Sequence, residues 1–206
     1  AWEYHLRTEE FEWSYQVYEI YGLSPTVEVT SDRGIAAYHP DDRDEIRDAF
    51  TAAVDSGESY DLELRLIDNN DDLRWVRTRG EPQFNDAGEV VRVRGTIQDI
   101  TERKTRADEL QQMRNAVDNA PIGIVVSDPT QDDNPLVYVN DGFVDETGYT
   151  REEAVGRNCR FLQGEETDET TVAELRQAID AEEPASVTIR NYRADGSAFW
   201  NRLEIA

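Results

Sequence analysis

The most informative stretch of this chain is Gly156-Arg157-Asn158-Cys159-Arg160-Phe161-Leu162-Gln163-Gly164, which contains the only cysteine among the 206 residues. A solitary cysteine is usually a small buried hydrophobe. On a short helix, however, residues four apart share a face, so Asn158 would stack with Leu162 and Cys159 with Gln163. A thiol, two amides and an apolar side chain would then face one ligand.

Other motifs lie on both sides of this nonapeptide. Asp128-Pro129 and Asn134-Pro135 precede it, and Arg176, Asn191-Tyr192 and Phe199-Trp200-Asn201 follow it. Through these motifs, residues 120–206 resemble LOV (light-oxygen-voltage) domains of the phototropin type, which are flavin-binding sensors of blue light. The resemblance implies a flavin cofactor and a photochemical role for the cysteine.

The chemistry of the side chains suits the parts of a flavin. An asparagine amide offers a donor and an acceptor to the pyrimidine edge of the ring, and guanidinium groups suit a phosphate. The resemblance implies ring contacts from Asn191 and Asn201, apolar contact from Leu162, ribityl contacts from Asn158 and Gln163, and phosphate contacts from Arg160 and Arg176. Both arginines could instead be surface ion-pair partners. The short segment between Cys159 and Thr167 favours FMN, because FAD-binding relatives tend to carry an insertion there.

The resemblance also implies a mechanism. Blue light drives a reversible bond between Cys159 and the flavin carbon C4a, while N5 gains a proton. Burial would keep the thiol protonated in the dark. The signal is expected to pass to an effector outside this chain, either a histidine kinase or a DNA-binding output. The chain stops inside the expected penultimate strand, so we expect the final strand to be missing and flavin retention to be an open question.

Composition excludes several classes of protein. One cysteine allows no internal disulfide, and no apolar run reaches the ~18 residues of a membrane span. The acidic N-terminus is not typical of a signal peptide. We therefore expect a cytoplasmic chain without membrane contact.

Acidic residues dominate both halves of the chain. Residues 1–104 carry 24 acidic and 12 basic side chains, and residues 105–206 carry 21 and 9, which gives a net charge of −12 for each half. An even acidic surface resembles that of halophilic archaeal proteins and should be stabilised by screening salt. Direct nucleic-acid binding is not expected, because it requires clustered Lys and Arg.

A degenerate repeat predicts two domains. Tyr21-Gly22 lies about 53 positions before Trp75, and Thr147-Gly148 lies about 52 before Trp200. We predict a PAS domain over residues 1–101, a helical linker over 102–120 and a LOV-type PAS domain over 121–206. The fold class is α+β, with an antiparallel sheet and flanking helices in each domain.

The first copy resembles PAS domains through Tyr21-Gly22-Leu23-Ser24-Pro25, His39-Pro40-Asp41-Asp42 and Asp99-Ile100-Thr101-Glu102-Arg103-Lys104. Pro40 predicts the start of a helix, whose buried stripe would be Ile46, Ala49, Phe50, Ala53 and Val54. Alternating apolar residues predict half-buried strands around Leu62, Leu64 and Leu66 and around Val91, Val93 and Ile97, with a turn at Asp86-Ala87-Gly88. His39 is a capping or loop residue rather than a haem ligand in this interpretation.

In the second copy, strands are predicted at Ile122–Ser127 and Leu136–Asn140, with short helices near Phe143–Thr147 and Glu152–Val155. A longer helix would begin at Thr167-Asp168-Glu169 and bury a stripe of apolar residues. That stripe comprises Val172, Leu175, Ala178 and Ile179. A hairpin follows, with its turn at Ala194-Asp195-Gly196.

The linker has no Gly or Pro before Pro121 and predicts a helix. Its apolar residues Leu110, Met113, Val117 and Ala120 recur at spacings of three and four. They would either pack on a domain face or form the seam of a parallel homodimer. Both alternatives stay open.

A non-photochemical pair of PAS domains, serving dimerisation or the sensing of a small ligand or of redox state, is the alternative function. We do not expect an enzyme, because a cysteine nucleophile needs a neighbouring base and both His5 and His39 lie in the other domain. We expect no metal site.

Overall fold

The computed structural model describes residues 1–205 of the chain, and Ala206 lies outside the described residues. The chain divides into two compact units, Ala1–Glu109 and Leu110–Ala206. Each unit is α+β and is described by itself.

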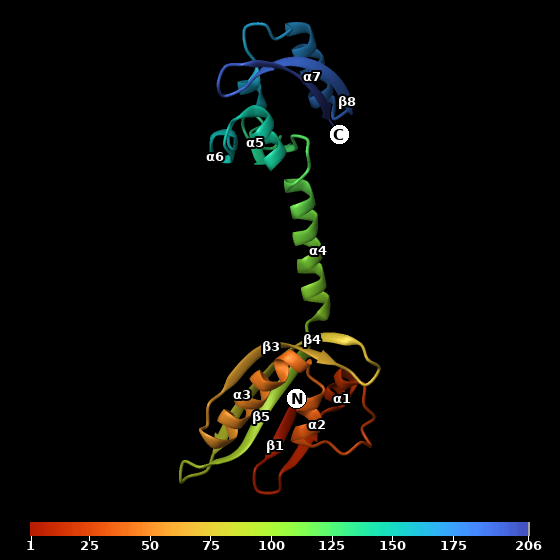
Figure 1. Ribbon diagram of the computed structural model, residues 1–206, viewed down its shortest axis with the longest axis vertical. Coiled ribbons are helices and arrows are strands. Elements are labelled where there is room, and N and C mark those ends of the chain that lie inside the picture. Colours follow the sequence, from red (N-terminus) through yellow and green to blue (C-terminus); the bar gives the residue numbers. More distant parts are fainter. Residues whose placement is uncertain (206) are drawn as a thin grey trace. The chain divides into compact units, whose positions relative to one another are not determined.

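The first unit contains a five-stranded antiparallel sheet with the order β2-β1-β5-β4-β3 (Figure 1). Its strands are β1 (Trp2–His5), β2 (Glu10–Trp13), β3 (Tyr60–Ile67), β4 (Leu73–Phe84) and β5 (Val90–Asp99). The helices are α1 (Tyr15–Tyr21), α2 (Ser31–Ala36), the 3₁₀ helix η1 (Pro40–Asp42) and α3 (Arg43–Asp55). The predicted antiparallel sheet with flanking helices is confirmed for this unit.

Alternating side chains from the sheet and one stripe of α3 make the core of the first unit. Ile46 and Ala53 of α3 are buried, and they belong to one cluster with Leu64, Leu66 and Val93. Burying such side chains stabilises the folded state by about 25 cal/mol for each Å² of apolar surface removed from water. The helix stripe and the strand alternation predicted from the sequence are confirmed here.

The helical segment begins at Pro40 as predicted, but its first turn is a 3₁₀ helix that precedes α3. Pro40 opens the 3₁₀ turn η1, and the Nδ1 atom of His39 accepts a hydrogen bond from the Asp41 amide at 3.4 Å. Arg65 donates to the Asp42 carboxylate at 2.6 Å and ties this turn to β3. His39 is thus a capping residue.

The predicted strand around Val91, Val93 and Ile97 is present as β5, but the expected burial of Val91 is wrong. Val91 is 43% exposed, whereas Val93 is fully buried. The register shifts between Gln83 and Phe84, because Gln83 pairs with Arg92 while Phe84 pairs with Val90. This β-bulge leaves Val91 without a partner on β4, although its carbonyl accepts from the Leu6 amide at 3.2 Å, so the simple alternation fails at that point.

A long helix, α4 (Thr101–Asp118), follows β5 and confirms the helix predicted for the linker to within two residues at its C-terminal end. Its first turn is held to the sheet of the first unit. The Thr101 hydroxyl accepts from the Trp75 amide at 3.0 Å, and Glu63 pairs with Arg103 at 2.6 Å and with Lys104 at 3.0 Å. The Lys104 ammonium also lies 4.6 Å from the centre of the Trp75 ring.

Two apolar residues of α4 are exposed, whereas Val117 near its C-terminal end is half-buried. Leu110 is 69% exposed and Met113 is 66% exposed. Within the second unit these two side chains do not pack against the other described elements. The alternatives of packing on a domain face and of a homodimer seam both stay predictions.

The second unit contains two hairpins and four short or medium helical segments. Its strands are β6 (Val125–Ser127), β7 (Leu136–Val139), β8 (Ala185–Tyr192) and β9 (Ala198–Ile205). The helices are α5 (Asp141–Thr147), α6 (Arg151–Ala154), the 3₁₀ helix η2 (Cys159–Leu162) and α7 (Glu169–Ala181). The predicted order of elements is confirmed, although β6 is half as long as predicted.

The strands of the second unit do not form one sheet. β6 pairs with β7, and β8 pairs with β9, as two separate antiparallel pairs. In the first unit β5 joins two pairs because it bonds to both β1 and β4, and among residues 121–205 no strand has this role. The expectation of a single sheet is therefore wrong for the described part of this unit, and the three residues of β6 are exposed.

The long helix of the second unit begins where predicted and is less buried than predicted. Asp168 is its N-cap, and its carboxylate accepts from the Thr171 amide at 2.8 Å. Val172, Leu175 and Ala178 are only half-buried, and Ile179 is 39% exposed. A two-stranded hairpin offers too little surface to bury the whole stripe.

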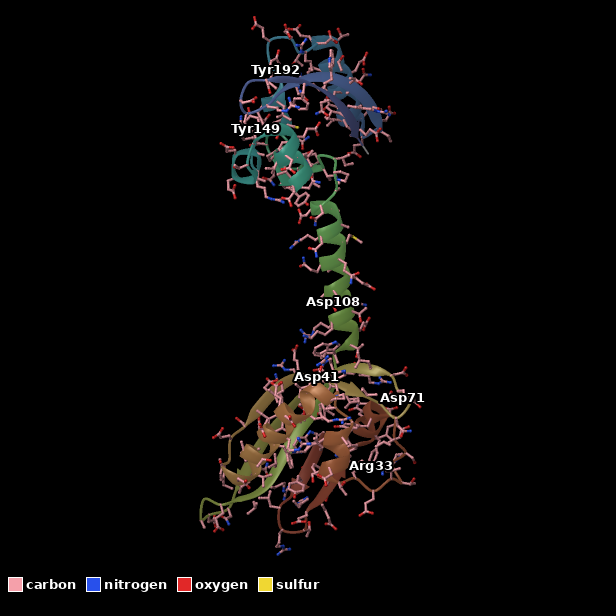
Figure 2. All side chains as sticks on the ribbon, in the orientation of Figure 1. Arg33, Asp41, Asp71, Asp108, Tyr149 and Tyr192 are labelled. Atoms are coloured by element: carbon pink, nitrogen blue, oxygen red, sulfur yellow. The ribbon has the colours of Figure 1, made fainter. Side chains whose placement is uncertain are left out.

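The repeat is visible in both units. Gly22 ends α1 and Gly148 ends α5, each with a positive φ (64° and 73°) that suits glycine. In the view of Figure 2, side chains with oxygen atoms project around the outline of each unit, in agreement with an acidic surface that is not confined to one half of the chain. Within the described residues, no helix has the length and apolar character to cross a bilayer.

Candidate functional site

The cysteine lies at the start of η2. Only Cys159–Leu162 are helical, Asn158 is the N-cap, and Gln163 is the C-cap. In a 3₁₀ helix, residues three apart share a face, so Cys159 is above Leu162. The expected stacking of residues four apart is wrong, because the segment is too short and too tightly wound.

Cys159 contacts the core of the second unit. It packs against the cluster of Leu136, Val139, Phe143, Ala154 and Leu162 and is itself partly buried. Burial raises the pKa of the thiol to about 11, because a thiolate would lose hydration there. The thiol is thus protonated at neutral pH.

Aromatic packing and β7 fix the orientation of η2. The rings of Phe161 and Tyr149 meet edge to face with centres 4.9 Å apart, and the Arg157 guanidinium lies 4.1 Å from the Phe161 ring centre. Leu136, at the start of β7, accepts from the Gly156 amide and donates to the Arg157 carbonyl, both at 2.8 Å. This main-chain pairing aligns the residues that lead into Cys159.

Two of the side chains predicted to contact the flavin are bonded to a turn formed by residues 128–134. The side-chain Nδ2 atom of Asn158 donates to the Asp133 carbonyl at 2.6 Å, and the Asn158 Oδ1 atom accepts from the backbone amide of Arg160 at 3.0 Å. The Arg160 guanidinium pairs with the Asp133 carboxylate. Asp133 was not identified from the sequence, although it adjoins the Asn134-Pro135 motif.

The loop after η2 is tied to β8. The Tyr192 hydroxyl accepts from the Glu166 amide at 2.9 Å, and the Thr167 hydroxyl donates to the Arg190 carbonyl at 2.7 Å. Gly164 lies against the Tyr192 ring, where an added Cβ would come within 2.4 Å of it. These contacts hold half-buried Gln163 beside the hairpin, and only glycine fits at position 164.

Asn191 on β8 and Asn201 on β9 are brought together by the hairpin. The Asn201 Nδ2 atom donates to the Asn191 Oδ1 atom at 3.0 Å. Asn191 is only 3% exposed, and its own Nδ2 atom makes one long contact of 3.4 Å, to the neighbouring Arg190 carbonyl. A buried amide with so weak a bond is available to an acceptor on a ligand.

Arg176 lies on an exposed turn of α7. Arg160, by contrast, is committed to Asp133. The structure therefore brings together Asn158, Cys159, Arg160, Leu162 and Gln163 around η2, and Asn191 with Asn201 on the hairpin. The joint phosphate contact of Arg160 and Arg176 stays a prediction.

The donor set fits an FMN. Two side-chain amides on neighbouring strands match the alternating donors and acceptors of a pyrimidine edge. The Nδ2 donor of Asn191 makes no hydrogen bond of normal length within the described residues. The thiol is neutral, as a partner of an uncharged ring requires. A guanidinium at η2 suits a phosphate.

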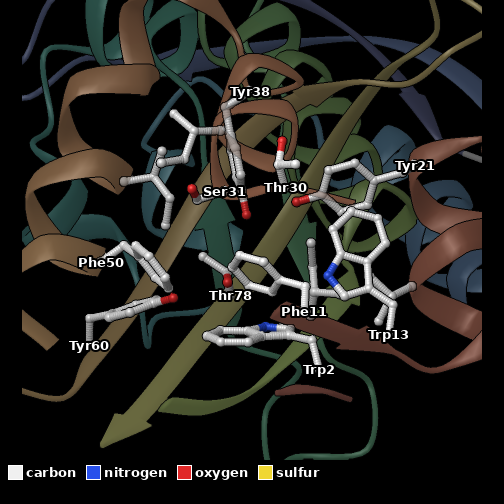
Figure 3. A pocket seen from close by; sticks show the side chains of 15 residues that line it. Trp2, Phe11, Trp13, Tyr21, Thr30, Ser31, Tyr38, Phe50, Tyr60 and Thr78 are labelled. Atoms are coloured by element: carbon white, nitrogen blue, oxygen red, sulfur yellow. The ribbon is translucent and has the colours of Figure 1, made fainter. Parts of the chain in front are cut away.

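The first unit has a different kind of site, a partly open pocket of about 50 Å³ (Figure 3). Its walls are aromatic, and hydroxyls of Tyr38, Tyr60 and Thr78 point into it (Figure 3). All fifteen lining residues are uncharged. Burial keeps the pKa of Tyr38 and Tyr60 above the ordinary tyrosine value, so both remain neutral. About 10–15 Å³ holds one water, so this pocket is far too small for a flavin.

Comparison with known proteins assigns both units to one family. A family model described as "PAS fold" matches residues 10–97, and a second, described as "PAS domain", matches residues 121–206. The chain belongs to the PAS family and contains two PAS domains.

Its relatives include photoreceptors. The chain is 48% identical over 90 residues to the blue-light photoreceptor of Listeria monocytogenes, a match that covers 44% of this chain and 36% of the relative. It is 46% identical over 118 residues to the bacterioopsin transcriptional activator of Halobacterium salinarum, covering 57% of this chain and 17% of the relative. The chain is thus homologous to LOV blue-light photoreceptors and to a halobacterial regulator.

A solved structure is also similar to part of the chain. The LOV domain of a blue-light activated histidine kinase from Erythrobacter litoralis is 52% identical, and the match covers 42% of this chain and 79% of that domain with a TM-score of 0.41. The chain spans only about a sixth to a third of the length of the two curated relatives named above.

Proposed function

We propose that the second PAS domain, residues 121–206, is a blue-light sensor that holds FMN and signals through a reversible bond from Cys159. The observation that carries the proposal is a neutral, partly buried thiol in the Asn158–Gln163 segment of a chain homologous to LOV photoreceptors.

Each side chain has a distinct part in this proposal. Asn191 and Asn201 hold the ring edge, Asn158 and Gln163 the ribityl chain, Leu162 the apolar side of the ring, and Arg160 with Arg176 the phosphate. When bound, the isoalloxazine ring supplies absorption of blue light and an electrophilic carbon. With such a ring bound, the Cys159 thiol would supply the sulfur for a bond to C4a and the proton for N5, and would take both back in darkness, so that no outside oxidant or reductant would be needed.

The output of the sensor lies in other parts of a longer assembly. Relatives include blue-light-activated histidine kinases and a transcriptional activator, so a kinase or a DNA-binding effector is the proposed partner. Transmission through α4 and homodimerisation along its exposed Leu110 and Met113 complete the proposal.

The test is the visible spectrum of FMN-loaded protein before, during and after blue illumination. We expect the blue absorption to bleach and to return in darkness. Cys159→Ala should stay yellow without bleaching, because the ring and phosphate contacts remain while the nucleophile is gone. Cys159→Ser controls for loss of the polar atom, and red light controls for heating. Reversible bleaching in Cys159→Ala would refute the assignment of Cys159, and failure of the chain to bind any flavin would refute the proposal.

The pocket of the first domain favours a second function, the sensing of a small neutral ligand. Its walls contain no charged side chain among the lining residues, so an ion would be buried without a partner. Its hydroxyls would bind one polar group of a molecule the size of a few waters. Titration with small alcohols, followed by amide NMR shifts, tests this. Thr78→Val should abolish the shifts, whereas Ser24→Ala on the surface should keep them.

A further inference from the structure

We infer that Asp133 is a specificity-determining residue of the flavin site. Its carboxylate forms an ion pair with the Arg160 guanidinium, the same group that a flavin phosphate would bind. This inference rests on the proposed function. It assigns Asp133 the role of weakening FMN binding selectively, without an effect on flavins that lack a phosphate.

The contacts of Asp133 coincide with two of the proposed flavin contacts. Its carboxylate pairs with Arg160, and its carbonyl accepts from the Asn158 side chain at 2.6 Å. The second contact continues to the Asn134 carbonyl at 3.4 Å. One residue thus engages both the group proposed for the phosphate and the group proposed for the ribityl chain.

The backbone of this turn explains how Asp133 reaches η2. Asp133 and Asn134 both have positive φ, 71° and 45°. Asp and Asn tolerate this region better than other non-glycine residues, although it still costs energy. The Asn134 Oδ1 atom is buried without a hydrogen-bond partner among the described residues. The turn therefore directs the carboxylate toward Arg160 at some cost, and a competing ligand can displace it.

Electrostatics decide which ligand competes. An FMN phosphate carries nearly two negative charges and several acceptors, whereas Asp133 carries one charge. Arg160 and Asp133 are 53% and 54% exposed, so their ion pair is weak and can be displaced. Riboflavin lacks a phosphate and leaves this ion pair intact. The carboxylate should therefore reduce FMN affinity and leave riboflavin affinity unchanged.

The experiment measures dissociation constants of FMN and riboflavin for the chain and for Asp133→Asn by fluorescence quenching. We expect Asp133→Asn to bind FMN about two- to fivefold more tightly, the range of an exposed ion pair, and riboflavin with unchanged affinity. Asp132→Asn is the matched control. It changes net charge equally, and Asp132 has no ion pair or side-chain hydrogen bond in the described part of the chain. It should shift FMN affinity by less than Asp133→Asn.

A second variant locates the effect at Arg160. In an Arg160→Gln background, Asp133→Asn should no longer change FMN affinity, because the contested group is absent. Equal shifts for FMN and riboflavin, or weaker FMN binding by Asp133→Asn, would overturn the role of Asp133 while leaving flavin binding established. Absence of binding of both flavins by every variant would instead overturn the proposed function.

Discussion

The Asn201 side chain donates to the Asn191 side chain across β8 and β9, with 3.0 Å between Nδ2 and Oδ1. Asn191 lies opposite Phe199 and Asn201 lies opposite Ile189, so the pair is diagonal across the hairpin. Diagonal neighbours on one face remain within reach of longer side chains. The hairpin register therefore joins two amides that lie ten residues apart in the sequence.

This pair predicts that shortening the Asn191 side chain lowers the affinity for flavin. Asn191→Ala should weaken FMN binding by about 1 kcal/mol, roughly fivefold, because it removes one hydrogen bond to the ring and leaves Asn201 without its acceptor. Equilibrium dialysis measures the change. Asn119→Ala in the linker segment is a control that removes an amide elsewhere and should leave the affinity unchanged.

The raised pKa of Cys159 predicts the pH dependence of its chemistry. Burial raises this pKa from 9.0 to about 11, so alkylation by iodoacetamide should stay slow up to pH 9 and accelerate near pH 11. An alkylation midpoint near the unfolded thiol value would contradict this environment.

The same shift predicts a loss of stability in alkali. The folded state retains the thiol proton that the unfolded chain releases, so stability should fall as pH rises from about 9 to about 11. Cys159→Ser, which has no group titrating in this range, should lack that part of the decrease. Thermal melts of both proteins in parallel provide the measurement.

The net charge of −24 predicts stabilisation by salt. Between ~0.1 M and ~1 M KCl the Debye length falls from about 10 Å to about 3 Å, so repulsion among carboxylates is screened. The unfolding midpoint should rise by several degrees. A flat or falling midpoint would contradict the halophilic interpretation, and a sugar at equal osmolality controls for excluded-solute effects.

The exposed residues of α4 predict a dimer. Leu110→Asp with Met113→Asp should reduce the molar mass in light scattering from that of a dimer to that of a monomer, because charges would replace the exposed apolar side chains of the seam. Gln112→Asp with Asn115→Asp adds the same charge on the opposite side of the helix and should preserve the dimer. A monomeric parent chain would remove the basis of this prediction.

Local patterns in the sequence predicted several elements of the fold, although α1 and α2 were not among them. The caps at His39 and Asp168 mark the starts of η1 and α7, and Gly148 follows the helix predicted to end at Thr147. These signals act over a few residues, because a capping side chain satisfies amides in its own first turn. The alternation of buried and exposed residues predicted the wrong side for Val91, because a bulge in the β4–β5 ladder changes the face on which this side chain lies.

The sequence by itself determined the two PAS domains, the helical linker, the acidic surface and the identity of the nonapeptide around Cys159, since each is a property of neighbouring residues or of composition. Only the tertiary structure decided that η2 is a 3₁₀ helix, that the Asn201 side chain forms a hydrogen bond with that of Asn191, and that Asp133 forms an ion pair with Arg160. The last two relationships join residues that lie ten and twenty-seven positions apart along the chain. They depend on strand register and on how a turn closes, and no local pattern records either.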